Sequence, residues 1–442
     1  MAQSTSLQNQ RSRVRLWLLL AAFLFTQMVT VSAFASDPVL DWIAITNDTA
    51  ISSGTNALFT SRVVSLVSAS VFDAVNGIEP RYRPLHVRPH APRHASAGAA
   101  AVQAAYAMLV KLYPALKPSL QVKRDASIAA LGSGESADSI RDGMIWGQAV
   151  ADAIRDWRLN DGFAPPPAPF FGVLSIAGSP AAVGLWRPTP KLNLPGAGTQ
   201  FATTTPWVLK RASQFRLPPP YALTSARYAA DYNEIKTMGA YGSRSRSDDQ
   251  SELALFWAGN TPLFWDRIAA QLAASRSLTL SENAHLFAQI NIAMADGGFA
   301  VFDTKYRYLF WRPITAIHEG DADGNPATDP DPAWAPWLDF YPAGTPAHPE
   351  YPSAHATLSG AAAYVLAATF GDETPFTVTS DVRPGTRSFP SFSAAVSEIA
   401  DARVFGGIHF RTSCLLGNVL GQSVAKYVLR HAMRADEDGR DD

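Results

Sequence analysis

The sequence predicts a mainly α-helical protein, built from one or more helical bundles with long proline-rich loops. Three observations predict this fold class. Apolar residues recur at helical spacing in alanine-rich segments from Pro38 to about Trp157, and a helical pattern returns from about Ala222 to Tyr308. Runs of alternating β-branched residues, which would indicate strands, are nearly absent. Between the two helical regions, residues 162–220 are rich in proline, which breaks helices.

The composition is that of a globular protein with a large core. The chain has 442 residues, of which 47% are apolar and 17% are charged. Its formal net charge of -1 gives no general reason to expect nucleic acid or an anionic membrane as a partner. Cys414 is the only cysteine, so no intrachain disulfide is possible, and we expect its side chain to lie in a helix core.

The first 35 residues have the features of a signal peptide. Three arginines within residues 11–15 precede an apolar run over residues 16–25, and Ala-Phe-Ala at 33–35 offers small residues where a signal peptidase cleaves. The apolar run is shorter than the roughly 20 residues that a membrane span needs. We therefore expect a secreted or periplasmic mature protein with no membrane part, and a retained anchor is the alternative.

The remaining chain divides into three predicted regions. Residues 36–160 form an N-terminal helical region, residues 161–221 a proline- and aromatic-rich loop segment, and residues 222–434 a C-terminal helical region. The aromatic residues of the loop segment distinguish it from a disordered linker, so we expect it to pack over the helices. In the third region, Thr279 and Glu282 match a capping box and predict the start of a helix.

Basic residues occur together in the segment KYRYLFWRP, the first of three candidate site segments. Lys305 and Arg312 are seven residues apart, which places them on nearly one face of a continuous helix. Pro313 is expected to end that helix. Taken alone, such a pair is more often a solvated helix end than a binding site.

The second segment, YPSAHATLSG, has the features of a capped helix start. Ser353 is a suitable N-cap, and the helix is expected to continue to Phe370 and stop at Gly371. A helix N-terminus carries unpaired N–H groups and a partial positive charge, so it can bind an oxyanion. His355 stands in the first turn of this helix, beside that anion position.

The third segment, ARVFGGIHFR, combines a cation and a histidine around a glycine pair. On a continuous helix, Arg403 and His409 would lie on different faces. Gly406 and Gly407 permit a break that could bring the two side chains to one point.

Together the three segments predict a site for a tetrahedral oxyanion. Two arginines and a lysine provide charged donors, while a serine and helix amides provide neutral ones. Two histidines can then divide the work, one binding the central atom and one moving protons.

The order and spacing of the segments resemble those of the vanadium-dependent haloperoxidases, which belong to the type 2 phosphatidic acid phosphatase superfamily. The superfamily pattern KxxxxxxRP, PSGH and SRxxxGxH corresponds here to residues 305–313, 352–355 and 402–409. The stretches FWAGNTP and HPEYPSAH also resemble the bacterial haloperoxidase branch. The resemblance implies helical bundles of the haloperoxidase and acid phosphatase type.

The resemblance also implies a cofactor and a role for each matched residue. The cofactor is vanadate, with His409 as its axial metal ligand and His355 as the acid–base group. Lys305 would polarise bound hydrogen peroxide for attack by a halide, giving a hypohalous acid equivalent that reacts with an organic acceptor. The residues implied to contact the vanadate oxygens are Lys305, Arg312, Ser353, Ala354 through its amide, and Arg403.

Four positions qualify the resemblance. Ala354 and Ala402 replace a glycine and a serine of the pattern. Ser413 stands where an aspartate often follows the second histidine, so the pattern gives no partner to orient His409. His348 precedes His355 by seven residues, where bromide-using relatives tend to have histidine and chloride-using ones phenylalanine. This favours bromide or iodide, and an exposed loop histidine is the alternative reading.

Two other functions fit the same residues. A secreted phosphohydrolase would use His409 to attack phosphorus and His355 to protonate the leaving oxygen. Vanadate resembles phosphate in charge and shape, so the pocket motifs alone do not separate the two enzymes. An extracytoplasmic protein that only binds oxyanions would not need two differently placed histidines. The lack of later spanning segments, the chain length and the matching upstream stretches favour the haloperoxidase.

Overall fold

The computed structural model describes residues 37–436, except residues 89, 173–182 and 343. The described residues contain thirteen α-helices, four short 3-10 helices and one two-stranded sheet, so the predicted fold class is confirmed. The predicted signal peptide, residues 1–35, lies outside the described residues. The α-helices are α2 (Pro38–Ser52), α3 (Ala57–Ile78), α4 (Ala97–Leu112), α5 (Lys117–Leu131), α6 (Ala137–Trp157), α7 (Ala226–Met238), α8 (Asp248–Phe256), α9 (Thr261–Ser275), α10 (Leu280–Tyr308), α11 (Pro313–His318), α12 (Ala354–Phe370), α13 (Phe392–Phe405) and α14 (Arg411–His431).

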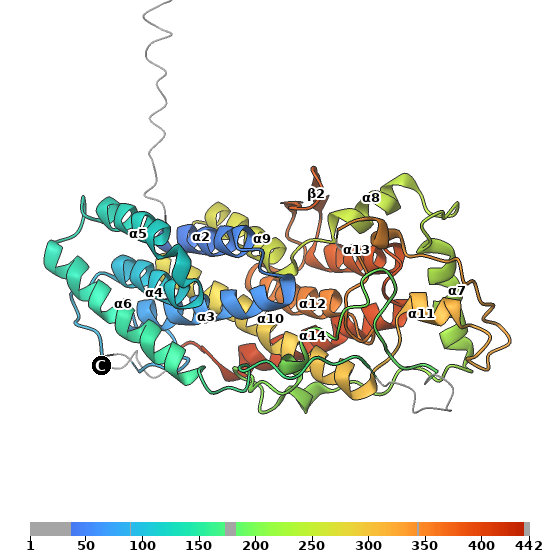
Figure 1. Cartoon of the computed structure of the whole chain (residues 1–442). Helices are drawn as coiled ribbons and strands as arrows, with labels where there is room; N and C mark the ends of the chain where they lie inside the picture. Colours follow the sequence, from blue (N-terminus) through green and yellow to red (C-terminus); the bar gives the residue numbers. More distant parts are fainter. Residues whose placement is uncertain (1–36, 89, 173–182, 343, 437–442) are drawn as a thin grey trace, which may run out of the picture. The chain divides into compact units, whose positions relative to one another are not determined.

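The long helix α10 lies at the centre of the helical packing. It contacts α3, α12 and α14, and 22 of its 29 residues are buried. In Figure 1, α4, α5 and α6 lie at one end of this arrangement, and α7, α8 and α11 lie at the other. The predicted capping box starts α10, with Thr279 and Glu282 each accepting a bond from the other's backbone N–H.

One described helix, α3, is long and apolar enough to cross a membrane. In the structure, 83% of its apolar window is buried among other helices, so α3 has the packing of a core helix. Cys414 is likewise buried in α14, as its sequence context predicts.

The proline-rich segment is irregular and is attached to α10. Its described residues contain two short 3-10 helices, Thr199–Ala202 and Ala212–Phe215, and no α-helix. Asp296 of α10 accepts hydrogen bonds from three consecutive backbone N–H groups, those of residues 207–209, at 2.7 to 3.0 Å. Burial raises the pKa of this carboxyl to about 6, and the three N–H donors oppose the rise. The boundaries of the three predicted regions remain a prediction.

A small hairpin departs from the nearly all-helical expectation. Strands β1 (Phe376–Thr379) and β2 (Thr386–Phe389) pair antiparallel, with Phe376 opposite Phe389. Four-residue strands are too short to show a clear period of two in the sequence, which explains why this hairpin was not predicted.

Helices α12 and α14 approach each other closely at glycine residues. A Cβ at Gly421 would lie 2.0 Å from the carbonyl oxygen of Thr357, and a Cβ at Gly417 would lie 2.7 Å from that of Ser353. The backbone N–H of Ser353 also donates to the carbonyl of Ser413 at 3.0 Å. This packing fixes the start of α12 against the first turn of α14.

We predict that Gly421→Ala destabilises the protein by about 1–3 kcal/mol or more, because the new methyl group would force two helix backbones apart. In an uncrowded helix the same change would stabilise by up to about 1 kcal/mol. Gly297→Ala in α10 is the matched control, since its Cβ would meet its nearest neighbour, Thr357, at an ordinary 3.6 Å. Urea unfolding of both variants measures the difference, and equal stabilities would contradict the close approach.

Candidate functional site

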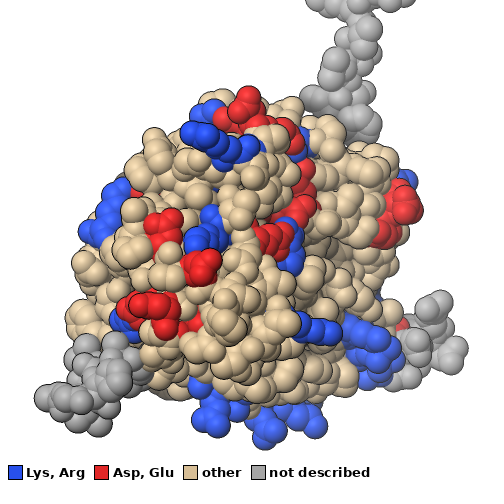
Figure 2. Space-filling model, turned by 90° about the vertical axis from the view of Figure 1, so that its right-hand side faces the viewer, with Lys and Arg blue, Asp and Glu red and all other residues tan. Residues whose placement is uncertain are grey.

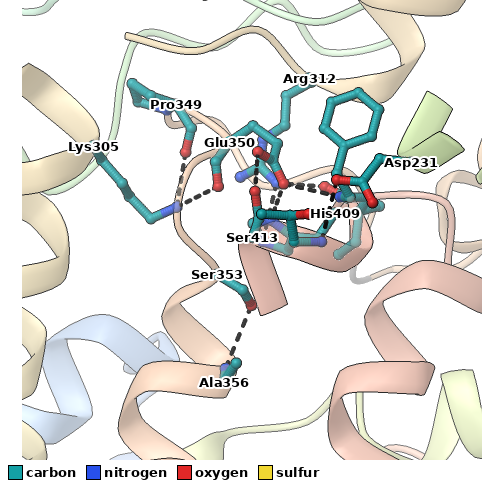
Figure 3. Close-up of polar contacts among 12 residues, drawn as sticks. Asp231, Lys305, Arg312, Pro349, Glu350, Ser353, Ala356, His409 and Ser413 are labelled. Carbon is teal, nitrogen blue, oxygen red and sulfur yellow. Dashed lines mark hydrogen bonds and ion pairs between the residues drawn. The ribbon is translucent and has the colours of Figure 1, made fainter. Parts of the chain in front are cut away.

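The three sequence segments meet at one place in the structure. Lys305 lies in the last turn of α10, Arg312 precedes α11 and Ser353 caps α12. Arg403 lies in the last turn of α13, and His409 lies in the link between α13 and α14. Figure 3 shows Lys305, Arg312, Ser353 and His409 around the loop that leads into α12.

Lys305 and Arg312 reach the site from different elements, so the prediction that they share one helical face is wrong. Helix α10 ends at Tyr308, and Leu309 adopts a left-handed conformation with φ 50°. Arg312 is the N-cap of α11, and Pro313 is the first residue of that helix. Proline is well suited to a first helical position, where its missing N–H would have no partner. Pro313 therefore begins a helix and does not end one.

The ammonium group of Lys305 is completely buried. Its Nζ donates to the carbonyl oxygens of Pro349 at 2.8 Å and Glu350 at 2.9 Å. Burial holds the pKa of Lys305 well below its usual value, and the nearby Arg312 lowers it further. Both acceptors belong to the loop that precedes α12, so Lys305 ties α10 to that loop.

Arg312 is the most extensively bonded cation of the site. Its Nε donates to the carbonyl of His348 at 2.9 Å, and Nη2 lies 3.0 Å from Nδ1 of the same residue. Nη1 donates to the carbonyl of Ile408 at 2.8 Å and lies 3.2 Å from Nε2 of His409. Burial lowers the pKa of Arg312 to about 10, and the carboxylate of Glu350 opposes this shift.

Arg403 and His409 are brought together by the predicted glycine break. Helix α13 ends at Phe405, and Gly407 has φ 78°, which favours glycine. Nη1 of Arg403 donates to the carbonyl of Trp257 at 3.2 Å. Its Nε is buried and has no hydrogen-bond partner among the described residues. Burial lowers the pKa of Arg403 to about 10.

These three cations form a buried cluster that fits an oxyanion. Lys305, Arg312 and Arg403 are 0 to 2% exposed, whereas the charges on the face shown in Figure 2 are exposed and of both signs. One fully buried carboxylate, Glu350, lies among the charges that act on Lys305 and Arg312. Burial favours the uncharged forms of these groups, and a bound anion would reverse that preference. The unpartnered Nε of Arg403 is a donor available to such an anion.

Helix α12 begins and ends as the sequence predicts. Ser353 is its N-cap, with Oγ accepting from the N–H of Ala356 at 3.4 Å, and Gly371 follows its last residue. Ser353 is completely buried. The N–H groups at the start of a helix have no acceptor within the helix, so the amide of Ala354 is suitably placed to bind an oxyanion.

His409 is held in one tautomer by its two partners. Nδ1 lies 2.9 Å from Oε1 of Glu350, and Nε2 lies 3.2 Å from the guanidinium of Arg312. Because a guanidinium only donates, Nε2 must carry the lone pair and Nδ1 the proton. Burial and the neighbouring cations hold the pKa of His409 well below its usual value. The imidazole is therefore neutral and can bind through Nε2.

Sequence reasoning missed Glu350. Its Oε1 also accepts from the N–H of Phe410 at 3.0 Å, and its Oε2 accepts from the hydroxyl of Ser413 at 2.6 Å (Figure 3). Burial raises the pKa of this carboxyl to about 7, while Ser413 and the nearby cations lower it. The available signal was an acidic residue next to the second motif, but no local pattern connects it to a histidine 59 positions later.

The other two histidines lie beside the cation cluster. Nε2 of His355 donates to the carbonyl of Gly259 at 3.3 Å, and its pKa is held well below the usual value by burial and then by Arg403. His348 is in contact with Arg312 and with the ring of Phe302, whose centroid lies 5.2 Å away. His348 is therefore not an exposed loop histidine.

Comparison with known proteins points to the same family as the sequence motifs. Residues 285–437 match a family model described as the VCPO second helical-bundle domain. The vanadium chloroperoxidase of Curvularia inaequalis is 29% identical over an alignment of 189 residues, covering 36% of this chain and 30% of that protein. A bacterial vanadium-dependent iodoperoxidase structure superposes with a TM-score of 0.75 and 25% identity, covering 91% of this chain and 97% of the other. The family model, the chloroperoxidase relative and the superposed structure together support a vanadium haloperoxidase.

Two features of these matches bear on the site. The family model spans every candidate site residue from Lys305 to Ser413. A bacterial vanadium-dependent chloroperoxidase, in its apo and holo forms, shares the fold with TM-scores of 0.64 and 0.63 at 18% identity, covering 84% and 85% of this chain and 94% and 92% of those chains. The curated chloroperoxidase is matched over less than two thirds of its length, so its activity as a whole protein does not transfer directly.

We predict that His355 in the anion-free protein titrates well below the usual imidazole pKa, because burial and Arg403 disfavour its charged form. Since its pKa is lowered, protonation should begin only well below pH 6.5. Adding orthovanadate or phosphate should raise that pKa, because a nearby negative charge favours the imidazolium. Histidine ring ¹⁵N spectra recorded against pH measure both effects. A midpoint near pH 6.5 without anion would contradict the buried environment.

Proposed function

We propose that this protein is a vanadate-dependent haloperoxidase, which oxidises a halide with hydrogen peroxide to a hypohalous acid equivalent. The observation that carries the proposal is the neutral Nε2 of His409 facing buried cations. This arrangement offers one nitrogen ligand and several positive donors to a single oxyanion. The family-model match over residues 285–437 and the structural match to an iodoperoxidase support the same activity.

Vanadate is the cofactor that the donor set fits. Nε2 of His409 would bind the metal, and three cations, the amide of Ala354 and the hydroxyl of Ser353 would contact the oxygens. The side chains that would neutralise its charge are Lys305, Arg312 and Arg403. When bound, vanadate supplies a Lewis-acidic centre that activates hydrogen peroxide without a separate redox partner.

Two residues of the chain have active roles in this proposal. The ammonium of Lys305, held by two loop carbonyls, would donate a hydrogen bond to hydrogen peroxide at the site and polarise it. His355 would accept or return a proton beside the metal. Its pKa is depressed in the free protein, so the negative charge of a bound oxyanion would bring it closer to the working pH.

The halide is proposed to be bromide or iodide. His348 occupies the wall of the site, with its ring against Phe302 and its Nδ1 at the guanidinium of Arg312. An imidazole at this position gives an approaching halide ion a polar surface to contact. The match to a protein described as an iodoperoxidase supports this preference.

We also propose that the protein acts outside the cytoplasm. The features of residues 1–35 support export, after which the mature chain would have no membrane segment. Its partners would then be hydrogen peroxide, a halide and an organic acceptor.

The decisive experiment measures bromination of a phenol dye by purified protein loaded with orthovanadate, with hydrogen peroxide and bromide. Dye bromination is expected, and His409→Ala should lower its rate by at least about 100-fold because the metal loses its nitrogen ligand. His94→Ala is the matched control, since His94 is exposed and pairs with Asp142 far from the site segments in the sequence. The control should keep the wild-type rate.

A phosphatase assay provides the contrary outcome. The same donors fit phosphate, so vanadate-free protein is tested on a phosphomonoester. Phosphate release that vanadate inhibits, without any bromination, would reject the haloperoxidase in favour of the phosphohydrolase.

We predict that His355→Ala binds orthovanadate with nearly wild-type affinity but loses at least about 100-fold in bromination rate, the lower end of the usual range for an acid–base group. Its imidazole is assigned a proton-transfer role and is not among the proposed vanadate contacts. Isothermal titration measures the affinity and the dye assay measures the rate. Unchanged bromination would remove the acid–base role of His355.

A further inference from the structure

We infer that Glu350 is the positioning residue for His409, in place of the carboxylate that is missing at position 413. The inference rests on the proposed function. The superfamily pattern often has an aspartate four residues after the second histidine, and this chain has Ser413 there. Serine has one hydroxyl and no charge, so it cannot by itself polarise an imidazole as a carboxylate does.

The contacts of Glu350 provide the missing function. Its Oε1 accepts from Nδ1–H of His409 at 2.9 Å, and its Oε2 accepts from the Ser413 hydroxyl at 2.6 Å. The side chain of Glu350 is 0% exposed. The serine therefore holds the carboxylate, and the carboxylate holds the histidine. Position 413, where the superfamily pattern often has an aspartate, is therefore still part of the same hydrogen-bonded chain.

Glu350 also reaches His409 from a different element than an aspartate at position 413 would. An aspartate at position 413 would reach His409 from the first turn of α14, four residues along the same segment. Glu350 reaches it from the loop before α12, on the other wall of the site. The backbone N–H of Glu350 is fixed to the carbonyl of Phe310 at 2.9 Å, which limits movement of the carboxylate.

This loop position also connects two functional groups. The carbonyl oxygens of Pro349 and Glu350 accept from Lys305, while the Glu350 side chain accepts from His409. One short segment therefore sets the position of His409, the proposed metal ligand, and of Lys305, the proposed hydrogen-bond donor to peroxide. A carboxylate acceptor at Nδ1–H also increases electron density at Nε2, the nitrogen proposed to bind vanadium.

The test uses orthovanadate affinity, measured by isothermal titration on the full-length protein. Glu350→Gln should weaken binding about 10- to 100-fold, as is typical when the partner of a ligating histidine is lost. The double variant Glu350→Gln/Ser413→Asp restores a carboxylate, now on α14. If Glu350→Gln weakens orthovanadate binding about 100-fold, the double variant should bind at least about tenfold more tightly than Glu350→Gln alone. Glu373→Gln, an exposed glutamate, is the control and should bind as the wild type does.

A second readout separates orientation from general damage to the fold. Nuclear magnetic resonance should show Nδ1 of His409 protonated in both the wild type and Glu350→Gln, because Arg312 keeps Nε2 as an acceptor. The Nδ1–H proton should resonate at lower field in the wild type, where its acceptor carries a charge. Circular dichroism confirms that each variant is folded. A merely structural role for Glu350 would change the stability without changing the Nδ1–H chemical shift.

Two results would overturn the inference. One is Glu350→Gln with wild-type vanadate affinity and an unchanged Nδ1–H chemical shift. The other is a folded double variant that binds no better than the single one, which would show that the two positions do not exchange roles. Because both readouts follow binding and not turnover, a wild-type protein that binds orthovanadate but brominates no dye would reject the proposed function and leave this test valid.

Discussion

The burial of three cationic side chains around one point constrains the whole C-terminal half of the protein. Lys305, Arg312 and Arg403 are almost fully removed from water, a costly arrangement unless their donors are bonded. Most of their bonding partners are backbone carbonyl oxygens, which belong to residues 257, 348, 349, 350 and 408. Carbonyl groups inside a helix are already bonded to the helix's own N–H groups. The site therefore has to be built from the links between helices.

This requirement explains why helix ends meet at the site. The cations come from the ends of α10 and α13 and from the start of α11, and Ser353 starts α12. The intervening loops remain free to direct their carbonyls towards the cations. The start of α12 adds N–H groups that can bind an anion. Loop carbonyls therefore bond the cations before an oxyanion binds, and the helix N–H groups can bond the oxyanion afterwards.

Packing among α10, α12 and α14 fixes the positions of the helix ends that form the site. Glycines at 417 and 421 allow α14 to approach the backbone of α12, and α10 packs against both. The N-terminal helices contribute through α3, which packs along α10. The structural match to an iodoperoxidase extends over 91% of the chain, so this support is part of the shared architecture as well as the site.

The sequence by itself determined the features that depend on neighbouring residues. The cap at Ser353, the break at Gly406 and Gly407, the capping box of α10 and the helical class of the fold all follow from local backbone chemistry. The three motifs also predicted which cations and histidines meet, because their spacing matched a known pattern.

Only the tertiary structure decided what each side chain contacts. A proline after Arg312 is compatible with the end of one helix or the start of the next, and packing around α11 selected the start. Glu350 and His409 are 59 residues apart, so no periodicity could relate them. Local sequence fixes backbone preferences over a few residues, whereas burial of a carboxylate beside an imidazole depends on the packing of α12, α13 and α14, which brings distant segments together.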